Sequence, residues 1–435
     1  MAHHLVTGIP TRLSMWQRVR AYAVPPSMIE TCTARRAAGD WAGACAAARV
    51  DVDLDLRAVR RRHGSDLAQR LRADLRCLAP DLLRWHLPRI APDGRLRPAL
   101  TVALARYGPL RLVVRTPPAP ADGGQRLSLS LWEGPGSVPA RAHPHPYPQR
   151  RFRLDLHRHL WDAGRASELA VRADAGWAVE AEALLRAERG SPRGAFTVRR
   201  GARDHDVLEL LAPDDSHAPN CRPVREVLPP QVVAALPVLP EAAARPLPDL
   251  ELLRAGLVAV ERLHPLVAGA LAGRGAGVPG GAVDADPGDP HRVECRGEVH
   301  RIALRDGVLS AVDHGPDQLR REELLVALGG PGLPCLRAID AVHRSPEALP
   351  AVRERLLHGD GGGALAVVEG LLGGGAVLRD GALKDELEWA AGRVVGHGLF
   401  RAGLDGAPVD CRDPSAVELK SNARGRARPR FALSR

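Results

Sequence analysis

The sequence predicts an α+β protein built from several regions, and three observations carry this prediction. Apolar residues recur at helical spacing near the N-terminus and again toward the C-terminus, whereas in the middle they alternate with polar residues. A stretch rich in Gly, Pro and Asp at 273–290 separates the middle from the C-terminal part. We therefore expect N-terminal helices, a β-rich middle region, a flexible linker and a mainly helical C-terminal domain that carries a β-hairpin.

The length of 435 residues is enough for two or three domains with a sizeable core. The composition changes along the chain set the expected boundaries, which are a helical N-terminal region at 1–94, a β-rich domain with a closing helix at 95–272, the linker at 273–290, a mainly α domain with a β-hairpin at 291–411 and a basic tail at 412–435.

The N-terminal region is expected to be helical over 28–87. In "SDLAQRLRADLRCLAP" an N-cap at Ser65 precedes apolar residues at intervals of four, four and three, and the pattern stops before Pro80. The apolar residues of this stripe are Leu67, Leu71, Leu75 and Leu78. The spacing predicts an amphipathic helix whose leucine stripe faces a core.

The middle region alternates with a period of two, which is typical of half-buried strands. The segments that follow this pattern are "LTVALARY", "LRLVVRT", "RLSLSLW" and "RFRLDLH". Pro- and Gly-rich stretches at 116–124 and 134–148 are expected to be loops between them. Residues from 249 onward, "DLELLRAGLVAVERLHPLVAGALAG", return to helical character.

The C-terminal domain has a strong hairpin signal, because Asp306-Gly307 lies between two apolar segments. Helices are expected over 317–328, from Ser345-Pro346 onward and over 381–391. "GDWAGACAAA" at 39–48 and "GDGGGALAVV" at 359–368 share a pattern that predicts two αα-hairpins with the same turn chemistry.

The charge balance is strongly basic. The net charge is +10 and the pI is about 9.9, and only Lys384 and Lys420 among the 61 basic residues are lysines. This balance suits association with nucleic acid or another polyanion. The seven cysteines are odd in number and scattered, which indicates reduced thiols. With no apolar run of transmembrane length and no signal peptide expected, the chain is predicted to be cytoplasmic and not to bind membranes.

The clearest candidate for a divalent metal site lies in "RFRLDLHRH". If this segment is a strand, Asp155, His157 and His159 share its polar face, and a His-x-His pair so placed can bind one metal ion. The competing interpretation is an ordinary solvated sheet face.

The same stretch also offers a basic strip that could contact phosphates, with Tyr147 nearby for stacking. The strip consists of Arg150, Arg151, Arg153 and Arg158, and the basic tail adds Arg424, Arg426, Arg428 and Arg430. These eight arginines are the predicted nucleic-acid contacts.

A second set of metal-capable residues lies in the C-terminal domain, namely Cys295, His300, His314, Cys335 and His343. The spacings C-x4-H and C-x7-H match no standard zinc pattern. The favoured interpretation is therefore core cysteines together with surface histidines.

No catalytic motif is present: the sequence contains no Walker-type phosphate loop, no dinucleotide-binding glycine motif in a βαβ setting, no G-x-S-x-G and no H-E-x-x-H. The expected function is that of an interaction protein that binds a macromolecular partner, either protein or nucleic acid. The alternative is a metal-dependent hydrolase, acting on phosphoesters, that uses His157 and His159.

Overall fold

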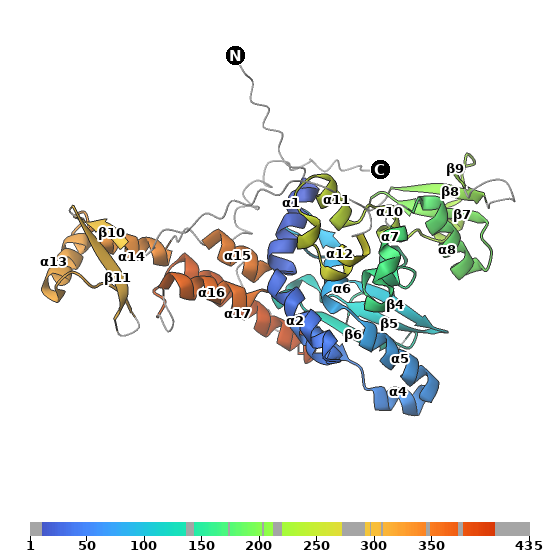
Figure 1. Cartoon of the computed structure of the whole chain (residues 1–435), viewed down its shortest axis with the longest axis horizontal. Helices are drawn as coiled ribbons and strands as arrows, with labels where there is room; N and C mark the ends of the chain where they lie inside the picture. Colours follow the sequence, from blue (N-terminus) through green and yellow to red (C-terminus); the bar gives the residue numbers. More distant parts are fainter. Residues whose placement is uncertain are drawn as a thin grey trace, which may run out of the picture. The chain divides into compact units, whose positions relative to one another are not determined.

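The computed structural model describes residues 11–135, 143–172, 175–201, 204–211, 220–271, 292–295, 297–305, 308–344, 349–372 and 377–404 (Figure 1). It confirms the α+β class, with helices near the N-terminus, a β-rich middle and a mainly helical C-terminal part. No helix in these ranges is long and apolar enough to cross a membrane.

The chain divides into two compact units. The first comprises Met1–Asp286 together with Leu357–Asp360, and the second comprises Pro287–Leu356 together with Gly361–Arg435. The first division, at Asp286, falls inside the stretch 273–290 that was predicted as a linker, and that stretch lies outside the described residues.

The first unit contains helices at both ends of its sequence and a β-rich part between them. Its α-helices and its one described π-helix are α1 Thr11–Arg18, the π-helix η1 Val19–Ala23, α2 Pro26–Ala37, α3 Trp41–Ala47, α4 Leu56–His63, α5 Ser65–Cys77, α6 Pro80–His86, α7 Leu169–Arg172, α8 Trp177–Arg189, α9 Pro230–Ala235, α10 Glu241–Ala244, α11 Pro248–Arg254 and α12 Pro265–Leu271. Its 3-10 turns are η2 Ala119–Ala121, η3 Gly123–Gln125, η4 Arg150–Phe152, η5 Arg158–Leu160, η6 Ala163–Glu168 and η7 Val260–Arg262. Its strands are β1 Val50–Asp53, β2 Arg89–Ile90, β3 Arg95–Leu96, β4 Thr101–Tyr107, β5 Leu110–Arg115, β6 Leu127–Trp132, β7 Gly194–Arg199, β8 His205–Leu211 and β9 Asn220–Pro223.

The central sheet of this unit has the strand order β1-β6-β5-β4, with β4, β5 and β6 antiparallel and β1 parallel to β6 (Figure 1). Three of the four segments predicted from alternation form β4, β5 and β6. The strand β1 interrupts the region 28–87 that was predicted to be helical throughout. Its Val50 and Val52 pair with Leu127 and Leu129, so partner strand β6, remote in sequence, overrides local propensity.

Helix α5 confirms the predicted amphipathic stripe. Leu71 and Leu75 are fully buried, and the helix ends at Cys77, before Pro80. The predicted N-cap is wrong by one residue: Gly64, at φ +90°, is the N-cap, and Ser65 is already the first helical residue. Glycine suits this position because a side chain rarely adopts that backbone conformation.

The predicted strand over 151–157 is wrong. The turns η4 and η5 lie at the two ends of this segment, and residues 153–157 between them form no strand. Leu154 donates one backbone hydrogen bond to Ala103 of β4, but the chain then turns because Leu154 and Leu160 both enter the same core. The strict alternation of "RFRLDLH" therefore arises from a turn that buries its apolar residues and not from a pleated strand.

The closing helical part of the first unit is shorter than predicted. Residues from 249 onward form α11 and α12 separated by the turn η7, because Gly256 adopts a positive φ of 66° and Pro265 begins a new helix.

The second unit is built from one small sheet and several helices. Its strands β10 Arg292–Cys295, β11 Glu298–Arg305 and β12 Val308–Ala311 pair antiparallel in that order, and its helices are α13 Pro316–Ala327, α14 Pro334–Arg344, α15 Leu349–Leu357, α16 Gly361–Leu372 and α17 Ala382–Arg401. The pairing of β11 with β12 confirms the hairpin predicted from Asp306-Gly307, although these two residues lie outside the described ones. Helix α17 extends well beyond the predicted 381–391.

Both predicted αα-hairpin turns are present. Gly39 follows α2 at φ +73° and Gly359 follows α15 at φ +81°, and in each case a new helix begins two residues later. The shared "GD" sequence is thus explained by the same left-handed glycine after a helix end.

Candidate metal centre

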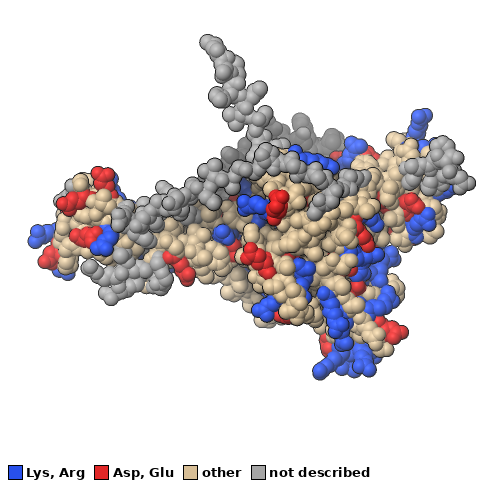
Figure 2. Space-filling model, in the orientation of Figure 1, with Lys and Arg blue, Asp and Glu red and all other residues tan. Residues whose placement is uncertain are grey.

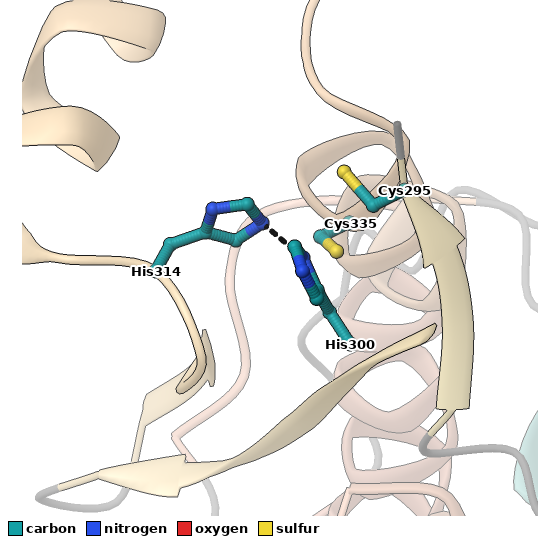
Figure 3. Close-up of side chains that lie close together, drawn as sticks. All are labelled: Cys295, His300, His314 and Cys335. Carbon is teal, nitrogen blue, oxygen red and sulfur yellow. Dashed lines mark hydrogen bonds between the residues drawn. The ribbon is translucent and has the colours of Figure 1, made fainter. Parts of the chain in front are cut away.

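Four metal-capable side chains meet in the second unit (Figure 3). Cys295 ends β10, His300 lies in β11, His314 follows β12 and Cys335 lies in the first turn of α14. Each offers one ligand atom, and these atoms all lie within 4.8 Å of one another. Two thiols and two imidazoles from four separate elements thus converge on one point.

The strand register and the turn after β12 explain why three of these residues meet. Because β10 and β11 pair Val293 with His300 and Cys295 with Glu298, Cys295 and His300 project from the same face of the sheet. The pairing of β11 with β12 ends at Ile302 and Ala311, and the turn that follows brings His314 to His300. One thiol and two imidazoles are thus placed together.

The fourth residue, Cys335, comes from the start of α14, a helix that packs against all three strands. The positive end of a helix dipole favours a thiolate at this position, and a thiolate is the form of cysteine that binds metals.

The ligand atoms lie close to the spacing of a tetrahedral site. Nδ1 of His300 and Nε2 of His314 lie 2.7 Å apart, hydrogen-bonded to each other. Zinc–nitrogen bonds of about 2.05 Å and zinc–sulfur bonds of about 2.3 Å give tetrahedral edges of about 3.3 Å between two nitrogens and about 3.8 Å between two sulfurs. Small side-chain shifts of the two imidazoles would therefore suffice to admit an ion.

Burial adds to this agreement. Cys295 and Cys335 are fully buried, and His314 is 6% exposed. Burial, together with the hydrogen bond between Cys335 and Cys295, raises the pKa of Cys335 to about 11. Without a metal the thiol of Cys335 is protonated, and metal binding must displace its proton. Two thiolates and two imidazoles in tetrahedral arrangement are the ligand set that zinc prefers.

The interpretation of these residues as core cysteines and surface histidines is thus half correct. The cysteines do belong to the core of the second unit, but the histidines converge with them instead of spreading over the surface. The side chain of His343 lies outside the described ones. The signal that could have found part of the site is the Asp306-Gly307 hairpin, because it folds the segment that carries His314 back toward the strand that carries His300.

The three residues of the metal site that was predicted in the first unit, Asp155, His157 and His159, do not converge on one point. The carboxylate of Asp155 binds Arg153 through two hydrogen bonds of 2.6 Å. Nε2 of His157 instead lies 3.0 Å from a carboxylate oxygen of Glu180, and the rings of His157 and His159 are 5.9 Å apart. Among the described residues, the Cys/His cluster of the second unit is the one group of three or more such ligands so close together.

The predicted basic strip is neutralised by carboxylates. Each of its four arginines forms an ion pair with a carboxylate. The pairs are Arg150 with Glu188 at 3.2 Å, Arg151 with Glu241 at 2.7 Å, Arg153 with Asp155 at 2.6 Å and Arg158 with Asp162 at 2.8 Å. Ion pairs with these carboxylates therefore offset the charge of the predicted strip. The tail arginines Arg424, Arg426, Arg428 and Arg430 lie outside the described residues.

Comparison with protein-family models, with curated proteins and with solved structures found no match for this chain.

Proposed function

We propose that the second unit is a zinc-stabilised interaction module that binds a protein partner. The observation that carries this proposal is the convergence of Cys295, His300, His314 and Cys335. Four protein ligands fill a tetrahedral zinc ion and leave no position for water or substrate, which is the pattern of structural zinc sites. The ion would supply folding energy, and the unit would act through its surface.

Helix α13 is the element whose position the zinc ion would fix. This helix lies between His314 and Cys335, so two of the four ligands bracket it. None of its described residues is buried, and only Leu319 packs partly against the core of the unit. Because its own packing is weak, the placement of α13 would depend on the ion that fixes both of its ends.

The C-terminal end of α13 exposes a group of apolar side chains. The exposed fractions are 59% for Leu324, 43% for Leu325, 47% for Val326 and 86% for Leu328. Single exposed apolar residues are common, but an adjacent group of them is typical of a surface that another protein covers. This group supports a protein partner for the second unit.

The alternative of a metal-dependent hydrolase at His157 and His159 has less support. Asp155 and His157 are already bound by Arg153 and Glu180, so a metal would have to displace both contacts. We therefore favour the interaction module.

Metal content and ligand substitution test the zinc part of the proposal. Elemental analysis of the full chain should give about one zinc per chain, and cobalt substitution should give the visible spectrum of a tetrahedral Cys2His2 site. Cys335→Ser should lose the metal, whereas Cys221→Ser, a half-buried cysteine in β9, should keep it. Less than about 0.2 equivalents of zinc in the wild type would contradict the proposal.

Substitution of the apolar end of α13 tests the interaction part. Leu324→Ser with Leu328→Ser should abolish stoichiometric recovery of a protein partner, and so should removal of zinc. Leu365→Ser, at an exposed position of α16 in the same unit, is the matched control and should leave recovery unchanged. Equal recovery by all variants would place any partner elsewhere on the chain.

A further inference from the structure

The hairpin of α4 and α5 in the first unit presents a dense group of exposed arginines. Residues 56–77 contain seven arginines and two aspartates. All seven are exposed, and they are Arg57, Arg60, Arg61, Arg62, Arg70, Arg72 and Arg76. Figure 2 shows blue side chains gathered where Figure 1 labels α4 and α5, whereas blue and red are mixed over the rest of the described surface in that view. We call these seven residues the hairpin arginines.

Most of the hairpin arginines are not neutralised. Arg62 binds Glu133 at 2.9 Å and Arg61 lies 3.9 Å from Asp55. Asp55 is also engaged as the N-cap of α4, where it accepts hydrogen bonds from two backbone N–H groups. In the part of the chain that the structure describes, five members have no carboxylate within ion-pair distance. Arg70 among them stacks over the ring of Tyr107, and the other four are Arg57, Arg60, Arg72 and Arg76. The predicted strip at 150–158 differs in this respect, since all four of its arginines are paired.

The hairpin holds its arginines on a fixed backbone. Val59 of α4 and Leu71 and Leu75 of α5 are buried in the main core of the first unit, and Gly64 at φ +90° makes the tight turn between the helices. The positive charges are therefore displayed on packed helices. Arg60 and Arg61 follow Arg57 by three and four residues, and Arg76 follows Arg72 by four, so like charges lie next to each other on each helix. This repulsion is relieved when a polyanion binds.

We propose that the hairpin arginines bind the phosphate backbone of double-stranded nucleic acid without reading its sequence. Residues 56–77 contain no Phe, Tyr or Trp, so the stacking platforms that single-strand binding requires are missing from this surface. A helix of 13 residues such as α5 is about 20 Å long, and duplex DNA carries about 12 charges over that length. The site does not depend on the zinc centre and lies in the other unit.

Fluorescence anisotropy with a labelled duplex DNA and the full zinc-loaded chain tests this proposal. Four phosphate contacts predict a slope of about −3.6 for the logarithm of affinity against the logarithm of salt concentration, which is about 150-fold between 50 and 200 mM salt. Arg72→Gln with Arg76→Gln should reduce the slope by about 1.8 and weaken binding about tenfold at low salt. Repeating the measurement with a duplex RNA shows whether the chain binds DNA or RNA more tightly. Loss of binding in the same variant with either duplex supports the proposal.

The matched control removes the same charge elsewhere in the first unit. Arg186→Gln with Arg222→Gln takes away two exposed arginines that are paired with Glu182 and Glu209, and should leave the slope unchanged. Thermal melting confirms that both double variants are folded. No binding to either duplex at about 50 mM salt would overturn the proposal, and so would equal losses in the two variants. Binding that is lost only when residues 421–435 are removed would also overturn it, because the contacts would then belong to the tail.

Discussion

The two units of this chain differ most in the size of their cores. The main core of the first unit contains 41 buried apolar residues among those described, including the large rings of Trp16, Trp85 and Trp161. The core of the second unit contains 14, none of them aromatic, and two of these are the cysteines Cys295 and Cys335. Small cores rarely stabilise a fold alone, and natural domains of this kind add disulfides or a structural metal.

This difference explains where the metal-binding residues are. In the first unit the histidines that were predicted to bind metal, His157 and His159, are buried, and His157 is held by the carboxylate of Glu180, so they take part in internal packing. In the second unit the cysteines are both core residues and candidate ligands, so the same side chains fill the core and complete the site. We infer that the first unit folds through apolar burial and the second through apolar burial plus zinc.

Removal of zinc should have the largest effect and should separate the two units. Structural zinc contributes about 10–16 kcal/mol of apparent binding energy at neutral pH, more than the whole stability of a typical domain. Chelation, or Cys335→Ser, should therefore abolish hydrogen-exchange protection in β10, β11, β12 and α14, while β4, β5 and β6 keep theirs. Protection that survives in the second unit would show that its apolar core is sufficient.

Truncation of a core leucine in the first unit should give the next largest effect. Leu83 of α6 is fully buried, and Leu83→Ala should lower the free energy of unfolding by about 2–5 kcal/mol. Urea unfolding followed by tryptophan fluorescence reports on this unit, because six of the seven tryptophans lie before residue 286. The zinc content of the variant should equal that of the wild type. A change in zinc content would mean that the two units are not independent in stability.

Acidification should destabilise the first unit through His159. Burial, together with the charges of His157, His86 and Arg172, lowers the pKa of His159 to about 3. The unfolded chain, with a histidine pKa of about 6.5, binds more protons below that pH, so the contribution of neutral His159 is complete above pH 6.5 and is lost as the pH falls toward 3. Between pH 7.5 and 5.5 the loss should be about 1.4 kcal/mol in urea unfolding. His159→Gln should flatten this dependence, whereas His145→Gln, at an exposed position, should not.

The prediction from sequence succeeded where local patterns coincide with tertiary structure. The leucine stripe of α5, the strands β4 to β6 and the hairpin at Asp306-Gly307 all follow from spacing and turn chemistry. It failed where contacts with segments remote in sequence determine the local structure. Strand β1 exists because β6 pairs with it, and the alternating segment 151–157 turns because Phe152 and Leu154 enter the main core while Leu156 packs against a smaller one.

The candidate sites follow the same rule. Cys335 is 35 residues beyond His300 in the sequence, so spacing alone could not join them, and only the packing of α14 on the hairpin does so. The arginines at 150–158 and at 57–76 look alike in sequence, but every arginine of the first group is paired with a carboxylate, whereas in the second group only Arg61 and Arg62 are. Charge in a sequence becomes a binding surface only where folding leaves it unpaired.

Loss of a surface ion pair should have the smallest effect on either unit. Arg186 and Glu182 stand four residues apart on α8, with 2.8 Å between guanidinium and carboxylate and 61% of the arginine side chain exposed. Solvent screens such a pair, so Arg186→Gln should cost about 0.3–0.5 kcal/mol in urea unfolding and nothing in zinc content. A loss above about 1 kcal/mol would mean that surface charge supports the first unit as strongly as a buried group does. That result would weaken the inference that this unit is stabilised chiefly by apolar burial, because the arginines paired on its surface would then carry a comparable share.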